Sequence, residues 1–204
     1  MSELTAIHKQ VEVCTKCALW RSRTRAVPGA GDPEARLMFV GEGPGFHEDR
    51  QGLPFVGAAG HLLDSLLEQI GLDRSEVFVT NVVKCRPPAN RGPEPDEIAA
   101  CTPYLDRQVA LIRPKIIATL GRYSMAHFLG SEVTISRIHG QSRRLGGRII
   151  YPLFHPAAAL RQERYRAALE QDFLRLRDLL AGGEVAGSEG SDVPKPPPSQ
   201  MSFF

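Results

Sequence analysis

The sequence lacks the segments that would export the chain or hold it in a membrane. None of its apolar runs approaches the roughly 20 residues that cross a bilayer. The first residues, Met-Ser-Glu-Leu-Thr, do not form the apolar stretch of a signal peptide. We therefore expect a soluble, cytoplasmic protein with no membrane partner.

Cysteine is scarce, and its spacing is informative. The chain has four cysteines, in a C-x2-C pair followed much later by a C-x15-C pair: Cys14, Cys17, Cys85 and Cys101. Disulfides are not expected in a reducing compartment. A redox pair of the thioredoxin type would open a helix after a strand, whereas the first two cysteines precede every expected strand. Four thiols suit tetrahedral zinc or an iron–sulfur cluster, and their spacing does not choose between the two.

Length and composition indicate one domain and a tail. About 180 residues are enough for a single domain with a full hydrophobic core, and we place this domain at residues 1–181. Residues 182–204 are rich in glycine, serine, glutamate and proline, so they are expected to form a flexible tether. The formal net charge is only +2. Several arginines nevertheless cluster around one expected strand and suit either phosphate binding or a solvated face: Arg137, Arg143, Arg144, Arg148, Arg161, Arg164 and Arg166.

Apolar, β-rich runs alternate with helical patterns along the chain. Strands are expected at residues 36–40, 77–83, 115–120 and 148–154. Helices are expected at residues 58–70, 95–112, 123–129 and 165–180. This alternation predicts an α/β fold, a three-layer α/β/α sandwich around a central, mostly parallel four-stranded sheet.

Unusual segments follow three of the expected strands. The first strand leads into a glycine-rich loop, residues 41–45 (GEGPG), whose glycines allow a close approach of backbone and ligand. Asn81 and Cys85 come at the end of the second strand, and His155-Pro156 follows the last. Open parallel sheets bind ligands beyond the carboxyl ends of their strands, so we expect these segments to form one site.

The ordered set of these motifs resembles the uracil-DNA glycosylases, and specifically the iron–sulfur class called family 4. The resemblance extends from Cys14 to Leu180 and includes the interval between Cys85 and Cys101. Each motif alone is weak, but their order is specific: GEGPG at 41–45, GLPFVG at 52–57, TNVVKCRPP at 80–88 and FHPA at 154–157.

The resemblance implies a monofunctional enzyme that starts base-excision repair. It would hydrolyse the N-glycosidic bond of deoxyuridine in single- and double-stranded DNA, as a monomer associated with the nucleoid. The four cysteines would hold a [4Fe-4S] cluster with a structural role, and zinc remains the alternative. Two other functions stay open: a related glycosylase for hypoxanthine or xanthine, and a noncatalytic nucleic-acid-binding module that has lost turnover.

The resemblance also assigns roles in the base pocket. Phe55 would stack on uracil, and the Asn81 carboxamide would distinguish uracil from cytosine by donating to O4 and accepting from N3–H. Without the motifs, a core phenylalanine and an ordinary strand-end asparagine are the commoner interpretations. His155 and the backbone around Gly43 would donate to uracil O2 and stabilise the departing anion, with Gly41 part of the same pocket.

Activation of water is harder to assign to a residue. Classical uracil glycosylases carry aspartate where this sequence has Gly43. Glu42 and Glu48 are the nearest carboxylates and either could orient a water molecule, while Glu48 could also line the wall that excludes the thymine methyl group. The sequence departs from its relatives at Phe46-His47, where related sequences are usually acidic.

Two further contacts are expected outside the base pocket. Residues 157–161 (AAALR) occupy the place of the family's minor-groove loop, so Leu160 or Arg161 would fill the gap left by the flipped base. The last five residues resemble the pentapeptide that binds bacterial sliding clamps: Gln200, Met201, Ser202, Phe203 and Phe204. A chance apolar end is the alternative interpretation of this short motif.

Overall fold

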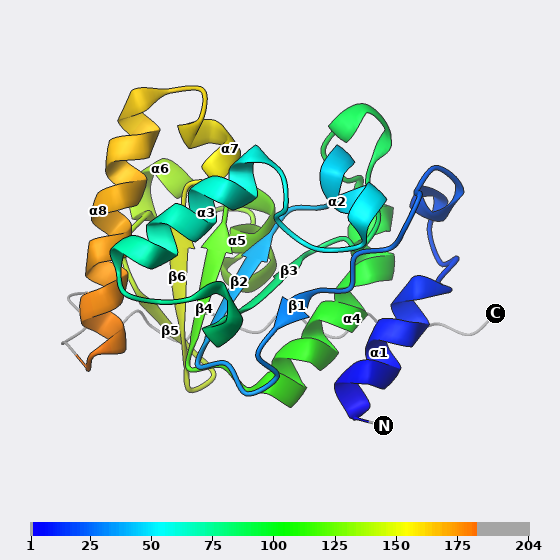
Figure 1. The fold of residues 1–204 in the computed structure, drawn as a ribbon, viewed down its shortest axis with the longest axis horizontal. Helices are drawn as coiled ribbons and strands as arrows, with labels where there is room; N and C mark the ends of the chain where they lie inside the picture. The colour runs from blue at the N-terminus through cyan, green and yellow to red at the C-terminus, as the bar shows by residue number, and fades with distance from the viewer. Residues whose placement is uncertain (1, 183–204) are drawn as a thin grey trace.

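The computed structural model describes residues 2–182, which fold into three layers around one sheet (Figure 1). Four parallel strands form its centre in the order β3-β2-β4-β6. Their bounds are Leu37–Gly41 for β2, Phe78–Asn81 for β3, Ile116–Leu120 for β4 and Arg148–Leu153 for β6. Strands β2, β3 and β4 are buried along their whole length, as their apolar runs predict. The predicted α/β class is confirmed.

The sheet has six strands, so the predicted count of four is wrong. The two additional strands lie at the edges and run antiparallel to their neighbours: β1 (Ala30–Gly31) beside β3, and β5 (Arg143–Leu145) beside β6. Neither contains an apolar run. Strand β1 has only two residues, and β5 is a partly exposed Arg-Arg-Leu segment joined to β6 by the turn at Gly146-Gly147. Pairing with a neighbour defines both edge strands, and no hydrophobic pattern marks them.

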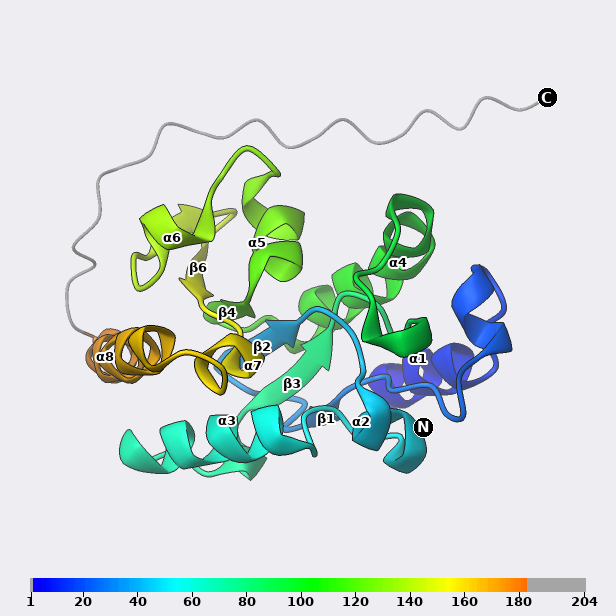
Figure 2. The same cartoon turned by 90° about the horizontal axis from the view of Figure 1, so that it is seen from above.

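Three helices cover one face of the sheet: α3 (Ala58–Gln69), α7 (Pro156–Ala159) and α8 (Glu163–Leu180). Figure 2 shows them together on one side of the strands. Leu37 and Phe39 of β2 point into this layer, where the Phe39 and Phe173 rings stack with centroids 5.8 Å apart. The predicted helices at 58–70 and 165–180 are close to α3 and α8.

The opposite face packs against α1 (Glu3–Glu12), α4 (Pro95–Ile112) and α5 (Arg122–Leu129). Met38 and Val40, the alternate residues of β2, point into this second core. The predicted helix 95–112 matches α4, which begins with Pro95 and a Glu94–Glu97 capping box. The short helix α6 (Ile135–Ile138) lies beside β6.

Several short elements were not predicted. Helix α1 precedes the first expected strand, and α2 (Phe46–Gln51) follows the glycine-rich loop directly. Among residues 2–182, short 3-10 helices occur at Ala18–Arg21, Arg74–Glu76 and Pro88–Asn90. In the part of the chain that the structure describes, no helix is both long and apolar enough to span a membrane.

Candidate active site

A cavity of about 430 Å³ opens beyond the carboxyl ends of β2, β3 and β6. It lies where ligand sites are expected in open α/β sheets. Loops, helix starts and a strand end far apart in the sequence supply its lining: Glu42, Gly43, Pro44, Gly45, Glu48, Phe55, Ala59, Asn81, Pro87, Asn90, Arg91, His155, Ala157, Ala158 and Arg161. The structure thus brings together in one cavity most of the residues predicted for the base pocket, while Gly41 and Leu160 do not line it.

Asn81 has an unusual environment for a buried amide. It ends β3 with 1% of its surface exposed, and neither its side-chain oxygen nor its side-chain nitrogen has a hydrogen-bond partner among the described residues. Leaving a buried polar group without a partner costs about 1–3 kcal/mol. Because the amide lines the cavity, a bound ligand with a matching donor and acceptor would remove this cost.

A buried ammonium group fixes the backbone at this strand end. Lys84 is 1% exposed, and its Nζ donates to the Asn81 carbonyl oxygen at 2.8 Å, to Gln108 Oε1 at 2.8 Å and to Thr80 Oγ1 at 2.5 Å. Gln108 in turn donates to the Pro28 carbonyl at 2.8 Å. Burial lowers the pKa of Lys84 to about 7. Because this network satisfies the backbone of Asn81, its side chain remains available to a ligand.

Gly41 has a packing reason to be glycine. A Cβ atom there would lie 2.4 Å from Asn81 Oδ1 and 2.7 Å from the Phe55 ring. Gly41 itself does not line the cavity, so its role is to let the Asn81 amide and the Phe55 ring approach each other across β2. Gly60, which sequence reasoning missed, has a similar role: its Cβ would lie 1.9 Å from the Phe55 carbonyl oxygen. A glycine inside a helical pattern was the available signal.

Phe55 is held in a strained backbone conformation, with φ at +52°. Its side chain is 7% exposed, and its ring lies 5.7 Å from the His155 ring at an interplanar angle of 29°. The two rings therefore form one wall of the cavity. A flat wall of this kind suits a planar heterocycle.

His155 is held as a neutral imidazole with a defined tautomer. Its Nδ1 accepts a hydrogen bond from the Ala157 backbone N–H at 3.1 Å at the start of α7, so the ring proton lies on Nε2. Burial lowers the pKa of His155 to about 4, and the negative charge of Glu48 acts in the opposite direction without offsetting it. The side chain therefore offers a neutral N–H donor across the physiological pH range.

Glu48 connects the two loops on either side of α2. One carboxylate oxygen accepts the Gly45 backbone N–H at 3.1 Å, and the other accepts those of Val56 and Gly57, each at 2.9 Å. These bonds fix the glycine-rich loop against the segment that carries Phe55. With both oxygens occupied, Glu48 is better suited to position these loops than to orient a water molecule.

Glu42 is the other carboxylate in the lining. Within residues 2–182 its carboxylate accepts no hydrogen bond, and burial raises its pKa, an effect that nearby Arg122 partly opposes. Backbone bonds from Val82 N–H to the Gly41 carbonyl and from Val83 N–H to the Glu42 carbonyl hold this loop beside β3. The Glu42 side chain therefore faces the cavity from a fixed backbone.

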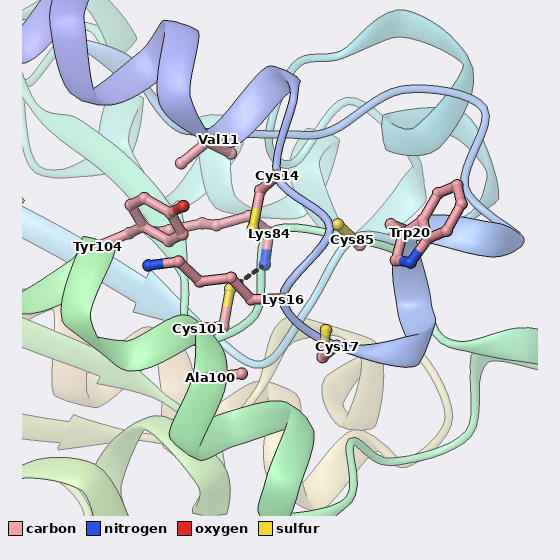
Figure 3. A pocket seen from close by; sticks show the side chains of 10 residues that line it. All are labelled: Val11, Cys14, Lys16, Cys17, Trp20, Lys84, Cys85, Ala100, Cys101 and Tyr104. Carbon is pink, nitrogen blue, oxygen red and sulfur yellow. Dashed lines mark hydrogen bonds between the residues drawn. The ribbon is translucent and has the colours of Figure 1, made fainter. Parts of the chain in front are cut away.

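The four cysteines line a second, separate cavity (Figure 3). They come from the end of α1, the turn that follows it, the loop after β3 and the middle of α4. All four are free thiols, and the walls around them combine apolar, aromatic and cationic side chains: Val11, Lys16, Trp20, Lys84, Ala100 and Tyr104.

Hydrogen-bond donors point at two of the sulfur atoms. The Lys84 backbone N–H lies 3.2 Å from Cys101 Sγ, and an Arg23 guanidinium nitrogen lies 3.1 Å from Cys85 Sγ. Burial raises the pKa of Cys101 to about 11 and also raises those of Cys85 and Cys17, so as free groups these thiols stay protonated. Within residues 2–182, no three potential ligands are grouped closely enough to hold a single metal ion.

Residues 28–177 match the family described as the uracil DNA glycosylase superfamily. The chain belongs to this superfamily. Its cavity and its motifs at the strand ends all lie within or beside the matched residues, whereas Cys14 and Cys17 precede them.

Comparison with individual relatives shows which group of the superfamily this chain belongs to. It is 51% identical to a type-4 uracil-DNA glycosylase of Sulfurisphaera tokodaii over 88% of this chain and 86% of the relative. It is 43% identical to the type-4 enzyme of Archaeoglobus fulgidus, over 88% and 94% of the two chains. A type-5 enzyme of Thermus thermophilus is 34% identical over 64% of this chain and 68% of its own length. The superfamily member therefore belongs to the type-4 group.

The rim of the cavity carries positive charge that the sequence only partly indicated. Of the clustered arginines, only Arg161 lines the cavity, while Leu160 beside it is 49% exposed and does not. Arg91 also lines it, held by two hydrogen bonds of 2.7 and 2.9 Å to the buried Glu97. Its place in the loop after the Asn81 strand was the signal that could have identified it. The predicted clamp-binding residues 200–204 lie outside the described residues.

Proposed function

We propose that this protein excises uracil from DNA and so starts base-excision repair. The observation that carries the proposal is the buried Asn81 amide, whose donor and acceptor have no partner beside the ring pair of Phe55 and His155. Its type-4 relatives are named uracil-DNA glycosylases.

Recognition of the base would use the Phe55 ring and the Asn81 amide. The flipped uracil would stack on Phe55, a contact worth about 1–3 kcal/mol in comparable sites. The Asn81 amide would donate from its nitrogen to uracil O4 and accept N3–H at its oxygen. With the amide in this orientation, cytosine would leave both atoms of Asn81 unsatisfied, because it presents a donor at the first position and an acceptor at the second.

Departure of the base would depend on donors at uracil O2. As the bond from C1′ to N1 breaks, its electron pair goes to the base and negative charge develops on uracil. The neutral His155 Nε2–H would donate to O2, and the Gly43 backbone N–H lies in the same lining and donates to no described residue. One fixed donor of this kind lowers the barrier by about 3–4 kcal/mol.

A water molecule would complete the reaction at C1′. We assign its orientation to Glu42, because the oxygens of Glu48 are already hydrogen-bonded. An ionised Glu42 would accept the water proton as the oxygen attacks the oxocarbenium-like sugar. Ionisation is opposed by the burial that raises the pKa of Glu42 and favoured by Arg122. Glu48 would instead hold the pocket wall near the C5 position of the base.

The direct test is incubation with single- and double-stranded oligonucleotides that carry one uracil, followed by alkali. The proposal predicts strand cleavage at the uracil position after alkali and an intact strand before it. A preparation that leaves no alkali-sensitive site in either substrate would contradict the proposal.

We further propose that the four thiols ligate a [4Fe-4S] cluster. Four free thiols around one cavity, two of them accepting hydrogen bonds from N–H groups, with Lys16 and Lys84 in the same lining, fit a negatively charged thiolate-bound centre. When bound, such a group would link α1 and the turn after it to α4 and to the loop after Asn81. Its contribution would be to stability, since the sulfurs line a separate cavity from the base pocket.

Replacing Cys101 with serine tests this proposal. The variant is expected to lose visible absorbance and bound iron, and to unfold at lower denaturant, because loss of a metal centre is among the few changes that cost more than about 4 kcal/mol. Iron analysis and denaturant unfolding measure both effects. Val13→Ser is the matched control, because Val13 is exposed and precedes Cys14 in the chain. This variant should keep its iron. Iron-free but zinc-containing native protein would contradict the cluster.

Leu160 and Arg161 are proposed to contact the DNA around the flipped nucleotide. Their positions after α7 support this assignment: Leu160 is an exposed apolar side chain, and Arg161 lines the cavity mouth. An exposed leucine beside an arginine suits a wedge that enters the stack while the cation meets phosphate.

The last five residues are proposed to bind a sliding clamp. Deleting residues 200–204 is expected to abolish binding to the clamp in a pull-down or calorimetric assay, because the paired phenylalanines and the glutamine would be the anchors. Excision on short oligonucleotides should be unchanged, since the cavity lies wholly in residues 42–161. Deletion of five residues at 187–191 is the length-matched control. Clamp binding that survives removal of 200–204 would refute the assignment.

A further inference from the structure

An exposed aromatic ring with two guanidinium groups lies beside the cavity. Phe46, the first residue of α2, is 47% exposed, which is unusual for so large an apolar side chain. The guanidinium carbon of Arg50 lies 5.7 Å from the centroid of its ring, and that of Arg86 lies 5.1 Å away. We call these three residues the Phe46 cluster.

The Phe46 cluster is continuous with the rim of the cavity. Gly45 and Glu48, on either side of Phe46 in the chain, both line the cavity. Pro87, the residue after Arg86, also lines the cavity. Asn90 lines it too, and its side chain accepts a hydrogen bond from Arg86 Nε at 2.7 Å. Figure 1 shows α2 beside the loop that leads into α4.

The helix that carries Phe46 and Arg50 is anchored to other segments, although the Phe46 ring is exposed. Glu48, in α2, accepts hydrogen bonds from three backbone N–H groups. The next residue, the buried Asp49, accepts the Thr24 backbone N–H at 2.8 Å. Phe46 and Arg50 are four residues apart, so they share one face of the helix. The fold thus presents the ring from an anchored helix while leaving it out of both cores.

We propose that the Phe46 cluster binds the nucleotide next to the flipped uracil in the substrate strand. The ring would stack on the neighbouring base, and the two guanidiniums would turn to its phosphates. Every base has a π-face, so such a platform accepts any sequence. This subsite rests on the proposed function. Its ligand is expected to be an unpaired nucleotide, because the Phe46 cluster adjoins the cavity and carries two positive charges. One aromatic side chain is too small for a stable protein interface.

Binding to product-like DNA tests the subsite without relying on catalysis. The probe is a fluorescent single-stranded oligonucleotide with a tetrahydrofuran abasic residue in place of deoxyuridine. Phe46→Ala is expected to raise its Kd by about 5- to 150-fold, the range that corresponds to one base–aromatic stack. Phe46→Trp should restore binding, whereas Phe46→Leu should not, because leucine keeps an apolar side chain without a π-face. Val13→Ala, another exposed apolar position, is the matched control.

A second probe identifies the partner of the ring. It carries abasic spacers on both sides of the central residue, and on it the unaltered protein and Phe46→Ala should have the same Kd. An equal Kd on the first probe, or a loss that persists with the spacers, would overturn the subsite. Failure of the proposed function can be distinguished from failure of the subsite. In the first case the protein would release no uracil, whether or not binding depends on Phe46.

Discussion

Replacing Asn81 with leucine is expected to abolish uracil excision while leaving the protein at least as stable as before. Leucine has a similar shape, but it can neither donate to O4 nor accept N3–H, so kcat/KM should fall by at least about 10²-fold. In the free protein the substitution removes two buried polar atoms without partners. The free energy of unfolding should therefore rise by about 1 kcal/mol.

Two measurements check this expectation: steady-state excision kinetics on a uracil oligonucleotide, and urea unfolding of the free protein. Thr119→Val is the matched control, because Thr119 Oγ1 is also buried without a partner among the described residues but does not line the cavity. It should gain similar stability with excision intact. Activity of Asn81→Leu within about threefold of the unaltered protein would show that the amide does not recognise the base.

Titration of His155 is expected to cause no change in kcat/KM between pH 5 and 8. Burial lowers the pKa of His155 to about 4, so its ring is neutral throughout this range and Nε2 keeps its proton. Below about pH 4, Nδ1 would gain a proton and lose the hydrogen bond from Ala157 N–H. Activity should fall there. Any loss from protonation of Glu42 should begin at a higher pH, because burial raises the pKa of that carboxyl, and it should persist in His155→Ala. His155→Ala should lower kcat/KM by about 10²- to 10³-fold at every pH in the range.

The same lowered pKa has a consequence for stability. Between about pH 4 and the ordinary histidine value near 6.5, the unfolded chain holds a proton on His155 that the folded protein lacks. Stability rises with pH wherever the unfolded state binds more protons, so this group makes the fold less stable as the pH falls through that window. Urea unfolding as a function of pH should show this slope, and His155→Ala should reduce it.

His127→Ala is the control for both pH experiments, because His127 lies on α5, hydrogen-bonded to Asp106 and outside the cavity lining. An inflection of kcat/KM near pH 6.5 that disappears in His155→Ala would contradict a neutral donor. It would indicate instead that a protonated imidazole stabilises the departing uracil.

The parallel strands and the long helices were predictable because each depends on a local hydrophobic pattern. Strand β4 (Ile116–Leu120) is one apolar run buried along its whole length, and α3 repeats leucines at helical spacing. The edge strands were not predictable, since β1 and β5 exist only through pairing with a neighbour. Helix α2 was missed for a similar reason: its six residues are held by contacts of Glu48 and Asp49 with other segments.

The candidate site was predictable as a set of residues but not as a set of contacts. Loops at strand ends meet at one edge of a parallel sheet, and this placed Asn81 and His155 together. The sequence could not indicate that Glu48 binds the backbone N–H groups of Val56 and Gly57, or that Gly41 makes room for the Phe55 ring. Both contacts join segments whose distance depends on the complete fold.

The link between the cysteines and the base pocket also required the structure. Lys84 lies between Asn81 and Cys85 in the sequence, where a lysine suggests a solvated side chain. Instead its ammonium is buried against the Asn81 carbonyl, while its backbone N–H points at Cys101 Sγ. One residue thus connects the thiol cavity to the strand end that carries the recognition amide.

The central claim is that the cavity releases uracil as an intact base and rejects the other pyrimidines. The most direct measurement is mass spectrometry of the small molecules released from otherwise identical oligonucleotides with deoxyuridine, thymidine or deoxycytidine at one position. We expect free uracil from the first, with an equal amount of abasic strand, and no base from the other two. Release of no free base from the uracil strand, or release of thymine or cytosine at a comparable rate, would contradict the account.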